Sequence, residues 1–472
     1  MRILMLSAEY APLAKTGGLA DAVAGLAAAL THSGHDVRAV LPGYGKPLPA
    51  DWAASPPERV AGVELRVATP AQGGPPVYVV ESDAIGRDGR IYLGDERDGA
   101  RFWAFSRAAV DLAAALDWRP DVIHCHDWHT SLVPALTRNS ALAAIPSVLT
   151  LHNAGYQGAF ARGALPSDAQ AAIAALEDEA ARARDYVVFL ELGIRHADAV
   201  TTVSPGYARE LRTPELGMGL DAVLRARGDD FVGILNGVDY TLWSPESDPF
   251  IGMRHARGDR SGKRRVKLAL CAELGLADDA PLVGAVTRLV EQKGIDLVVA
   301  ALPELLARTR ARFAILGSGE PDLEAALAAL ARAHPERLAF RAGYDEALAH
   351  RIIAGSDLLL MPSRYEPCGL TQLYAMRYGT IPVVRKTGGL ADTVTHFDPA
   401  TGEGTGSVFE HSDVQGLLWG LTTALGWYED QDLWQRLMDN ALRADFSWAR
   451  QSREYEALYR RLLGSAQTEP SA

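Results

Sequence analysis

The sequence predicts an α/β protein of two doubly wound domains, each with a parallel sheet covered by helices on both faces. At the start of the chain, an apolar run, a loop, a helix-spaced segment and a second apolar run follow one another, and the same order restarts at residue 281. The stretch KTGGLADAV at 15–23 also returns as KTGGLADTV at 386–394, with eight of nine positions identical. Alternating strands and helices of this kind are typical of parallel sheets.

In the first half, residues 3–8 form a short apolar run of the buried-strand type. Residues 19–34 have the apolar spacing of a helix that ends at Gly34, and the glycine-rich loop lies between the two. Further strands are expected at 35–42, 120–127, 145–153 and 231–239, with a strand, turn and helix at 199–211. Pro, Gly and charged residues dominate 240–265, so we place the domain boundary at residue 243.

The second half begins with a strand and loop at 281–294 and a helix at 295–308. The next elements expected are a strand at 311–320, a helix at 321–335, and strands at 338–344, 357–363 and 381–389. Residues 432–463 have the spacing of two helices. We therefore assign 1–242 to the first domain, 243–435 to the second, 436–463 to C-terminal helices that cross back to the first domain, and 464–472 to a disordered tail.

Composition limits the classes of function. A net charge of −12 argues against a general nucleic-acid binder or a protein docked on a membrane surface. The first residues lack the basic region of a signal peptide, and no apolar run approaches membrane-spanning length. The three cysteines, Cys125, Cys271 and Cys368, form neither a disulfide framework nor a metal-ligand spacing, which indicates a reducing, cytoplasmic compartment. The sequence does not specify an oligomeric state.

The repeated glycine-rich stretch points to an anionic ligand. In open parallel sheets ligands bind at the carboxyl ends of the strands, and a glycine turn that opens a helix exposes backbone N–H groups suited to phosphate. Lys15 or Lys386 would add a point charge, so a pyrophosphate-bearing ligand is expected. No G-x-G-x-x-G follows the first strand and no GK[ST] is present, so neither a nicotinamide dehydrogenase nor a Walker loop fits. The alternative is two helix-entry turns that resemble each other by chance or duplication.

Eight stretches of the chain carry a family resemblance. They are KTGGLADAV, HCHDWHTSL, LHNAGYQGAF, VTTVSPGYARE, GILNGVDYTLWSP, VTRLVEQKGIDLV, SRYEPCGLTQLYAMRYGTIPVVRKTGGLADTV and FSWARQSREYEALY. Together they resemble the bacterial glycogen synthases, members of the ADP-glucose-dependent starch and glycogen synthase family of retaining glycosyltransferases. The resemblance runs from about Arg2 to Leu462. It implies the GT-B fold, in which two Rossmann-like domains face a deep interdomain cleft, with the acceptor on the first domain and the donor on the second.

The resemblance also implies roles for individual residues. Those expected to hold the donor diphosphate are Lys15, Gly17, Gly18, Arg288, Lys293, Gly369, Leu370 and Thr371. Those expected around the glucose are His152, Asn236, Glu366 and Cys368, with Tyr344 stacked on the adenine and Asp127 near the acceptor. The catalytic set would be Lys15, His152, Arg288, Lys293 and Glu366, with no metal and no cofactor. Lys386 receives no catalytic role.

Several of these residues also have structural interpretations. Glu366 could cap the following helix, Arg288 could form a surface ion pair, and Cys368 could be a small buried thiol. His152 follows an apolar strand and could be a core histidine, and Tyr344 could serve packing alone. The three histidines His124, His126 and His129 suggest a metal, but the HDWH context resembles the family, which disfavours a metal site.

The implied reaction moves glucose from ADP-glucose to the non-reducing 4-hydroxyl of an α-1,4-glucan such as glycogen, with retention of configuration. Two stretches depart from the family: Val188 and Glu191 stand where the family usually has Asn and Lys, and the loop near Gly94 is shorter than usual. Both departures bear on the acceptor rather than the donor. The alternatives are a related GT-B glucosyltransferase with another donor or acceptor, and a non-catalytic glucan-binding paralogue.

Overall fold

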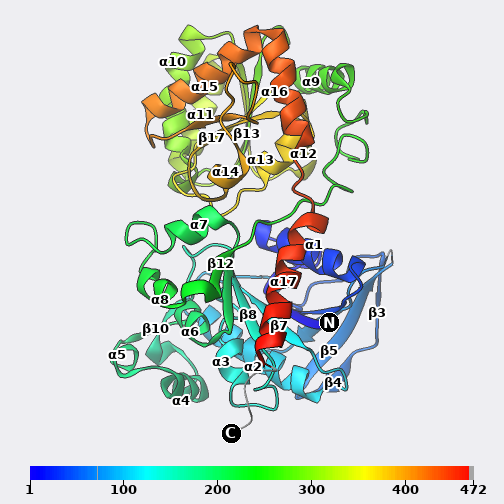
Figure 1. The fold of residues 1–472 in the computed structure, drawn as a ribbon, viewed down its shortest axis with the longest axis vertical. Helices are drawn as coiled ribbons and strands as arrows, with labels where there is room; N and C mark the ends of the chain where they lie inside the picture. Colours follow the sequence, from blue (N-terminus) through cyan, green and yellow to red (C-terminus); the bar gives the residue numbers. More distant parts are fainter. Residues whose placement is uncertain (72, 467–472) are drawn as a thin grey trace. The chain divides into compact units, whose positions relative to one another are not determined.

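The computed structural model describes residues 1–71 and 73–466 as two compact units (Figure 1). The first unit consists of residues 1–237 together with the chain from Trp448 onward, and the second of Val238–Ser447. The boundary therefore lies at residue 238 rather than 243. The return to the first unit begins at Trp448, not at 436, so the helix before it belongs to the second unit. The predicted tail at 464–472 is helical as far as Ala466, and its remainder lies outside the described residues.

A ten-stranded sheet forms the centre of the first unit. Seven strands are parallel, and an antiparallel extension continues beyond β6. In sheet order the strands are β12 (Phe231–Gly233), β11 (Ala199–Thr202), β8 (Ser147–Leu151), β7 (Val122–His126), β1 (Arg2–Leu6), β2 (Asp36–Pro42), β6 (Val77–Glu81), β5 (Val63–Pro70) and β3 (Trp52–Ala54), with β4 (Glu58–Val60) paired to β5. Strands β7 and β8 are buried along their whole length, because helices cover both faces of a parallel sheet.

The second unit contains a six-stranded, all-parallel sheet. Its order is β15 (Leu338–Ala342), β14 (Arg312–Gly317), β13 (Leu282–Val286), β16 (Leu358–Met361), β17 (Ile381–Arg385) and β18 (Ser407–Phe409). Numbered within the unit, this is the doubly wound order 3-2-1-4-5-6, and the first unit repeats it with β6, β2, β1, β7, β8 and β11. The prediction of two doubly wound parallel sheets is confirmed.

Helices connect the strands of each unit. In the first unit they are α1 (Gly18–His32), α2 (Arg97–Ala115), α3 (Val133–Thr137), α4 (Ser167–Leu176), α5 (Glu179–Arg182), α6 (Phe189–His196), α7 (Pro205–Glu210), α8 (Asp221–Ala226) and α17 (Trp448–Ala466). In the second unit they are α9 (Arg260–Leu274), α10 (Ile295–Arg308), α11 (Pro321–Ala333), α12 (Glu346–Gly355), α13 (Thr371–Arg377), α14 (Gly388–Thr393), α15 (Val414–Glu429) and α16 (Gln431–Arg443). Within the described residues, no helix combines the length and apolarity needed to cross a membrane.

Helix α17 is fixed to the sheet of the first unit by a buried polar contact. The hydroxyl of Tyr459 lies 2.7 Å from Nδ1 of His124 on β7, and the opposite ring nitrogen lies 2.7 Å from the Thr150 hydroxyl on β8. All three side chains are buried. A buried polar group needs such a partner, so this contact adds to the apolar packing that holds the last helix on the unit.

The departures at Val188 and Glu191 fit their surroundings. A two-stranded antiparallel sheet, β9 (Ala159–Ala161) with β10 (Tyr186–Val188), precedes α6, and Val188 is buried at its end. On α6, one carboxylate oxygen of Glu191 accepts from Arg184 at 2.9 Å and the other accepts from Arg195 at 2.8 Å. Glu191 therefore neutralises two arginines, and these pairs hold the pKa of Glu191 below its ordinary value although burial opposes them.

We expect Glu191→Lys, which installs the residue usual in the family, to destabilise the first unit. The lysine would face Arg184 and Arg195 in place of a carboxylate. Both arginines would lose their close contact with Glu191, and Arg195 would keep the longer 3.7 Å pair with Asp178. The cost should be roughly 1 kcal/mol, because the arginines are partly solvated. The shift in urea midpoint measures it, with Glu191→Gln as the intermediate case. A lysine variant as stable as the natural protein would contradict this interpretation.

Candidate functional site

The second unit has a pocket at the topological switch point between β13 and β16. Its lining includes Val286 and Thr287 at the end of β13, Ser363 after β16, and Lys293 and Glu366. Strands on either side of this point connect in opposite directions, so the loops at their carboxyl ends separate and leave a crevice. The topology thus brings together residues that are up to about eighty positions apart in the chain.

A partly buried ion pair occupies this pocket. The ammonium of Lys293 donates to Oε2 of Glu366 at 2.6 Å, and the Ser363 hydroxyl donates to the same oxygen at 2.9 Å. The Glu366 side chain is only 6% exposed, so its charge is held by these two donors. A charge-assisted bond in such a poorly solvated place is strong and fixes the direction of both side chains. The interpretation of Glu366 as a simple helix cap does not account for this pair.

The other predicted donor residues of the second unit lie at or near the same edge. Arg288 follows β13 and donates to the amide oxygen of Gln292, whose nitrogen donates to the carbonyl of Tyr365 next to Glu366. Cys368 is buried. Residues 369–371 lead into α13, which begins at Thr371. Tyr344 follows β15 and is 76% exposed, so packing alone does not explain its ring.

In the first unit, the loop after β1 is organised by a buried carboxylate, Glu9. One oxygen of Glu9 accepts from the backbone N–H of Thr16 at 2.6 Å and of Gly17 at 3.2 Å, and the other accepts the Thr16 hydroxyl at 2.7 Å. The Gly17 N–H, for which the family resemblance implies a phosphate contact, donates to Glu9 in this structure. Lys15 lies beside this anchored segment, with its ammonium 2.9 Å from the carboxylate of Asp21 on α1.

Tyr92 connects this loop to the shortened segment near Gly94. Its hydroxyl donates to Glu9 at 2.6 Å, and its ring stacks on His129. Burial, together with the nearby Glu9 charge, raises the pKa of Tyr92, so the hydroxyl stays protonated and donates. The shortened segment therefore holds Glu9 in place, a contact that the sequence did not predict.

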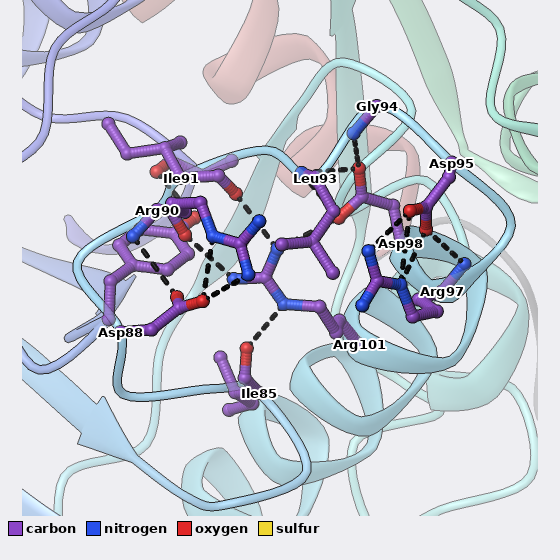
Figure 2. Close-up of polar contacts among 12 residues, drawn as sticks. Ile85, Asp88, Arg90, Ile91, Leu93, Gly94, Asp95, Arg97, Asp98 and Arg101 are labelled. Atoms are coloured by element: carbon purple, nitrogen blue, oxygen red, sulfur yellow. Dashed lines mark hydrogen bonds and ion pairs between the residues drawn. The ribbon is translucent and has the colours of Figure 1, made fainter.

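The shortened segment is itself held by a buried arginine (Figure 2). The Arg101 guanidinium donates to the carbonyl oxygens of Ile85, Arg90 and Ile91 and forms a 2.8 Å ion pair with Asp98. Asp98 in turn accepts the backbone N–H groups of Leu93 and Gly94 at 2.9 Å. Because both charges are buried and paired, residues 85–98 form a fixed support for Tyr92.

Histidines and an aspartate gather at the carboxyl ends of β7 and β8. Asp127 has a positive φ of 58° and accepts the backbone N–H of His152 at 2.7 Å. The His152 ring is hydrogen-bonded to the ring of His126, with 3.0 Å between Nε2 and Nδ1. Burial raises the pKa of Asp127 to about 7 and lowers that of His152 to about 3. Asp127 therefore fixes the backbone of His152 while His126 fixes its ring.

We expect this histidine cluster to make the first unit unstable in acid. Burial lowers the pKa of His124, His129 and His152 to about 3, and that of His126 also falls. Below pH 6.5 these histidines become protonated in the unfolded chain but stay neutral in the folded protein. The free energy of unfolding therefore decreases as pH falls from 6.5 towards 3, by roughly 2 kcal/mol per histidine at pH 5. Asp127 has the opposite effect because its pKa is raised: its protonation in the folded state increases the free energy of unfolding over the same pH interval. This gain offsets the loss from about one histidine.

Thermal unfolding between pH 7.5 and 5 measures this dependence. His129→Gln should flatten it, whereas replacing the exposed His32 by Gln should leave it unchanged. If the melting temperatures of both variants depended on pH in the same way, the buried histidines would not be the cause of the acid instability.

The sequence-predicted residues thus form two groups. The first unit carries Lys15, Gly17, Gly18, Asp127, His152 and Asn236, and the second carries Arg288, Lys293, Tyr344, Glu366, Cys368, Gly369, Leu370 and Thr371. Asn236 is buried, and its amide oxygen has no partner among the described residues, which is the property of a group available to a ligand.

Sequence reasoning missed Glu9, Tyr92 and Ser363. The signal that could have found Glu9 is its position, an acid between a buried strand and a glycine-rich loop. Within residues 1–71 and 73–466, no group of three or more His, Cys, Asp or Glu side chains is arranged to hold a metal ion.

Comparison with known proteins identifies the family. Residues 2–226 match the family described as starch synthase catalytic domain, and residues 269–442 match glycosyl transferases group 1. A glycogen synthase of Anaeromyxobacter sp. (strain Fw109-5) is 45% identical over 98% of this chain and 99% of its own length. The catalytic domain of starch synthase IV from Arabidopsis thaliana, bound to ADP and acarbose, is 36% identical with a TM-score of 0.90, covering 98% of this chain and 99% of that one.

A more distant structure supports the fold alone. Sucrose-phosphate synthase from Thermosynechococcus elongatus is 20% identical with a TM-score of 0.64, over 98% of this chain and 99% of its own. Both units thus have the Rossmann-like architecture of GT-B glycosyltransferases. With this fold, and with relatives that match it from end to end, the chain belongs to the glycogen synthase and starch synthase family of glucosyltransferases.

Proposed function

We propose that this enzyme transfers glucose from ADP-glucose to the non-reducing 4-hydroxyl of an α-1,4-glucan, with retention of the anomeric configuration. The observation that carries the proposal is the end-to-end match to glycogen synthases in a chain that keeps Lys15, Arg288, Lys293 and Glu366. ADP is favoured as the leaving nucleotide because it is bound to the related starch synthase. Three free, buried cysteines and a net charge of −12 support a cytoplasmic enzyme that binds neither nucleic acid nor membrane.

The proposed roles follow the chemistry of each group. Arg288, Lys293 and Lys15 would stabilise the negative charge that develops on the departing ADP. Residues 369–371 would add backbone donors to the same phosphates. Glu366 would accept hydrogen bonds from glucose hydroxyl groups through the oxygen not shared by Lys293 and Ser363.

On the first unit, His152 and Asn236 would contact the glucose, and Asp127 would lie near the acceptor. Tyr344, with its exposed ring, would stack on the adenine. Cys368, at the turn beside Glu366, would lie at the sugar. No metal ion or cofactor enters this set of roles.

The proposed reaction needs no carboxylate nucleophile. The bond between the anomeric carbon and the phosphate oxygen breaks, a bond from the acceptor 4-oxygen forms on the same face of the sugar, and the acceptor proton passes to the departing diphosphate. Glu366 is engaged on Oε2 by Lys293 and Ser363, which favours a hydrogen-bonding role over covalent attack. Exclusion of water would protect the oxocarbenium-like state from hydrolysis.

Transfer of labelled glucose to glycogen tests the proposal. ADP-glucose and UDP-glucose should be compared in parallel with EDTA present, using Lys15→Ala and Glu366→Ala as site variants. We expect incorporation from ADP-glucose that both substitutions reduce by at least a hundredfold. Incorporation from UDP-glucose alone would indicate another GT-B glucosyltransferase. A folded protein that binds glycogen but transfers from neither donor would indicate a non-catalytic paralogue.

A further inference from the structure

The second glycine-rich stretch, residues 386–394, lies beside the loop that carries Glu366. It follows β17, and the Glu366 loop follows β16; these two strands are adjacent and parallel. Their carboxyl ends therefore meet at one edge of the sheet. The near-identity with residues 15–23 suggested a second phosphate loop, but the contacts of the two copies differ.

Lys386 points to a surface partner rather than to the pocket. Its ammonium lies 2.7 Å from the carboxylate of Glu410, and these side chains are 58% and 67% exposed. The pocket at the switch point is lined by Lys293 and Glu366 and does not include Lys386. Lys386 is thus part of a solvated ion pair, which contributes little fixed geometry.

Gly389, in contrast, is pressed against the backbone of the Glu366 loop. Its N–H donates to the carbonyl of Glu366 at 3.0 Å. A Cβ at this position would lie 2.2 Å from the carbonyl oxygen of Cys368 and 2.4 Å from its Cα, distances that atoms in contact do not reach. Glycine at position 389 is therefore required for this close approach of two backbone segments.

Side chains of the same segment complete this support. The Thr393 hydroxyl donates to the carbonyl of Gly389 at 2.6 Å and accepts from the Gln372 amide at 3.1 Å. That amide also donates to the carbonyls of Cys368 at 3.0 Å and Gly369 at 2.9 Å. Thr393 and Gln372 are buried, so these bonds are shielded from water.

Arg385, just before the stretch, donates from Nε to the carbonyl of Ser363 at 2.9 Å. The loop from Ser363 to Gly369 is thus held at its start by Arg385, at its centre by Gly389 and at its end by Gln372. Together these contacts restrain the loop, and with it the backbone that carries the Glu366 carboxylate.

We propose that the second glycine-rich stretch is a positioning element for Glu366 and Cys368, acting through Gly389 and Thr393 and not through Lys386. It holds the loop at 366–369 in the position where the Glu366 carboxylate meets Lys293. The role of that carboxylate in turnover rests on the proposed function. The two copies of one sequence thus have different tasks: the first carries Lys15 in the first unit, and the second supports the backbone of the Glu366 loop in the second unit.

Gly389→Ala is the direct test. The added methyl must displace the Cys368 backbone, because space and not backbone conformation is the obstacle: φ of Gly389 is not positive. We expect kcat with ADP-glucose to fall at least tenfold while the KM for glycogen stays within twofold. Gly426→Ala on α15 is the matched control, since its added Cβ meets nothing within 4 Å, and it should behave as the natural enzyme.

A second pair of variants avoids the risk that Gly389→Ala does not fold. Thr393→Val keeps the shape but loses both hydroxyl contacts, and should lower kcat at least fivefold. Thr393→Ser keeps the hydroxyl and should restore at least half of the natural kcat. Lys386→Ala should leave kcat within twofold. Circular dichroism and melting temperature confirm that each variant is folded.

Two results would overturn the proposal: Gly389→Ala and Thr393→Val with kcat within twofold of the natural enzyme, or Lys386→Ala with a loss as large as theirs. ADP affinity, measured by calorimetry on the same variants, separates this outcome from failure of the proposed function. If the natural protein bound ADP without transferring glucose, the transferase proposal would fail. In that case the ADP affinities of the variants would decide: a weaker affinity in Gly389→Ala but not in Lys386→Ala would support the positioning role, and equal affinities would overturn it.

Discussion

Replacing Lys293 by methionine should lower kcat with ADP-glucose by about 10²–10³-fold, equivalent to roughly 3–4 kcal/mol of transition-state stabilisation. The substitution removes a positive charge from the pocket and leaves the Glu366 carboxylate, 6% exposed, with the Ser363 hydroxyl as its hydrogen-bond donor. Methionine preserves much of the volume of the lysine stem, so the effect is electrostatic. Steady-state rates of glucose incorporation into glycogen measure it.

The matched control for Lys293→Met is Lys386→Met. Lys386 is also paired with a glutamate, at 2.7 Å, but both side chains are well exposed. Exposed pairs contribute little, and this one lies outside the pocket, so kcat should change less than twofold. Equal activities for the two variants would show that burial of the Lys293–Glu366 pair does not matter for turnover. Glu366→Gln should lower kcat as well, because it removes the charge that holds Lys293.

Replacing Arg101 by methionine should destabilise the first unit by about 3–5 kcal/mol, because it leaves the buried Asp98 carboxylate without its cation. Three carbonyl oxygens, of Ile85, Arg90 and Ile91, would lose a donor at the same time (Figure 2). The urea midpoint of the first unit measures the loss. We also expect a lower kcat at temperatures where the variant is folded, because Tyr92 and through it Glu9 lose their fixed support.

Arg97→Met controls for this change within the same segment. Arg97 pairs with Asp95 at the surface, and no measurable loss of stability is expected from its removal. If the two variants unfolded at the same urea concentration, the buried network would have no special role. Tyr92→Phe separates the two effects of Arg101→Met, since it removes the hydroxyl contact with Glu9 and leaves the Arg101–Asp98 pair intact.

Much of the fold follows from local sequence pattern. Apolar runs of strand length alternate with segments of helical spacing. The strands β2, β7 and β8 fall within the predicted ranges, and β1 begins one residue before its range. The helix predicted at 19–34 is α1, Gly18–His32. Local periodicity determines these elements because each buries one face or one continuous run. The domain boundary was misplaced by five residues, because loop composition shows where regular structure ends but not which unit the loop contacts.

The site was only partly predictable. Motifs identified Lys15, Arg288, Lys293 and Glu366 by residue type and by position after strands, and the switch point brings Lys293 and Glu366 to 2.6 Å. The hydrogen bonds that hold the surrounding segments in place were not predictable from such motifs. The contact of Tyr92 with Glu9 spans 83 positions, and the contact of Tyr459 with His124 spans 335. No local pattern records such pairs.

The sequence by itself determined the order and type of elements, the two parallel sheets and the residue types at the ends of their strands. Only the tertiary structure decided that the two copies of KTGGLAD have different surroundings. Identical local sequences form similar loop-to-helix turns because the local energetics are the same. Their contacts differ because the first copy donates to Glu9 through the N–H groups of Thr16 and Gly17, while the second is pressed against Cys368 at Gly389. Those neighbours come from distant segments, and the free energy of such contacts is set by packing rather than by local sequence.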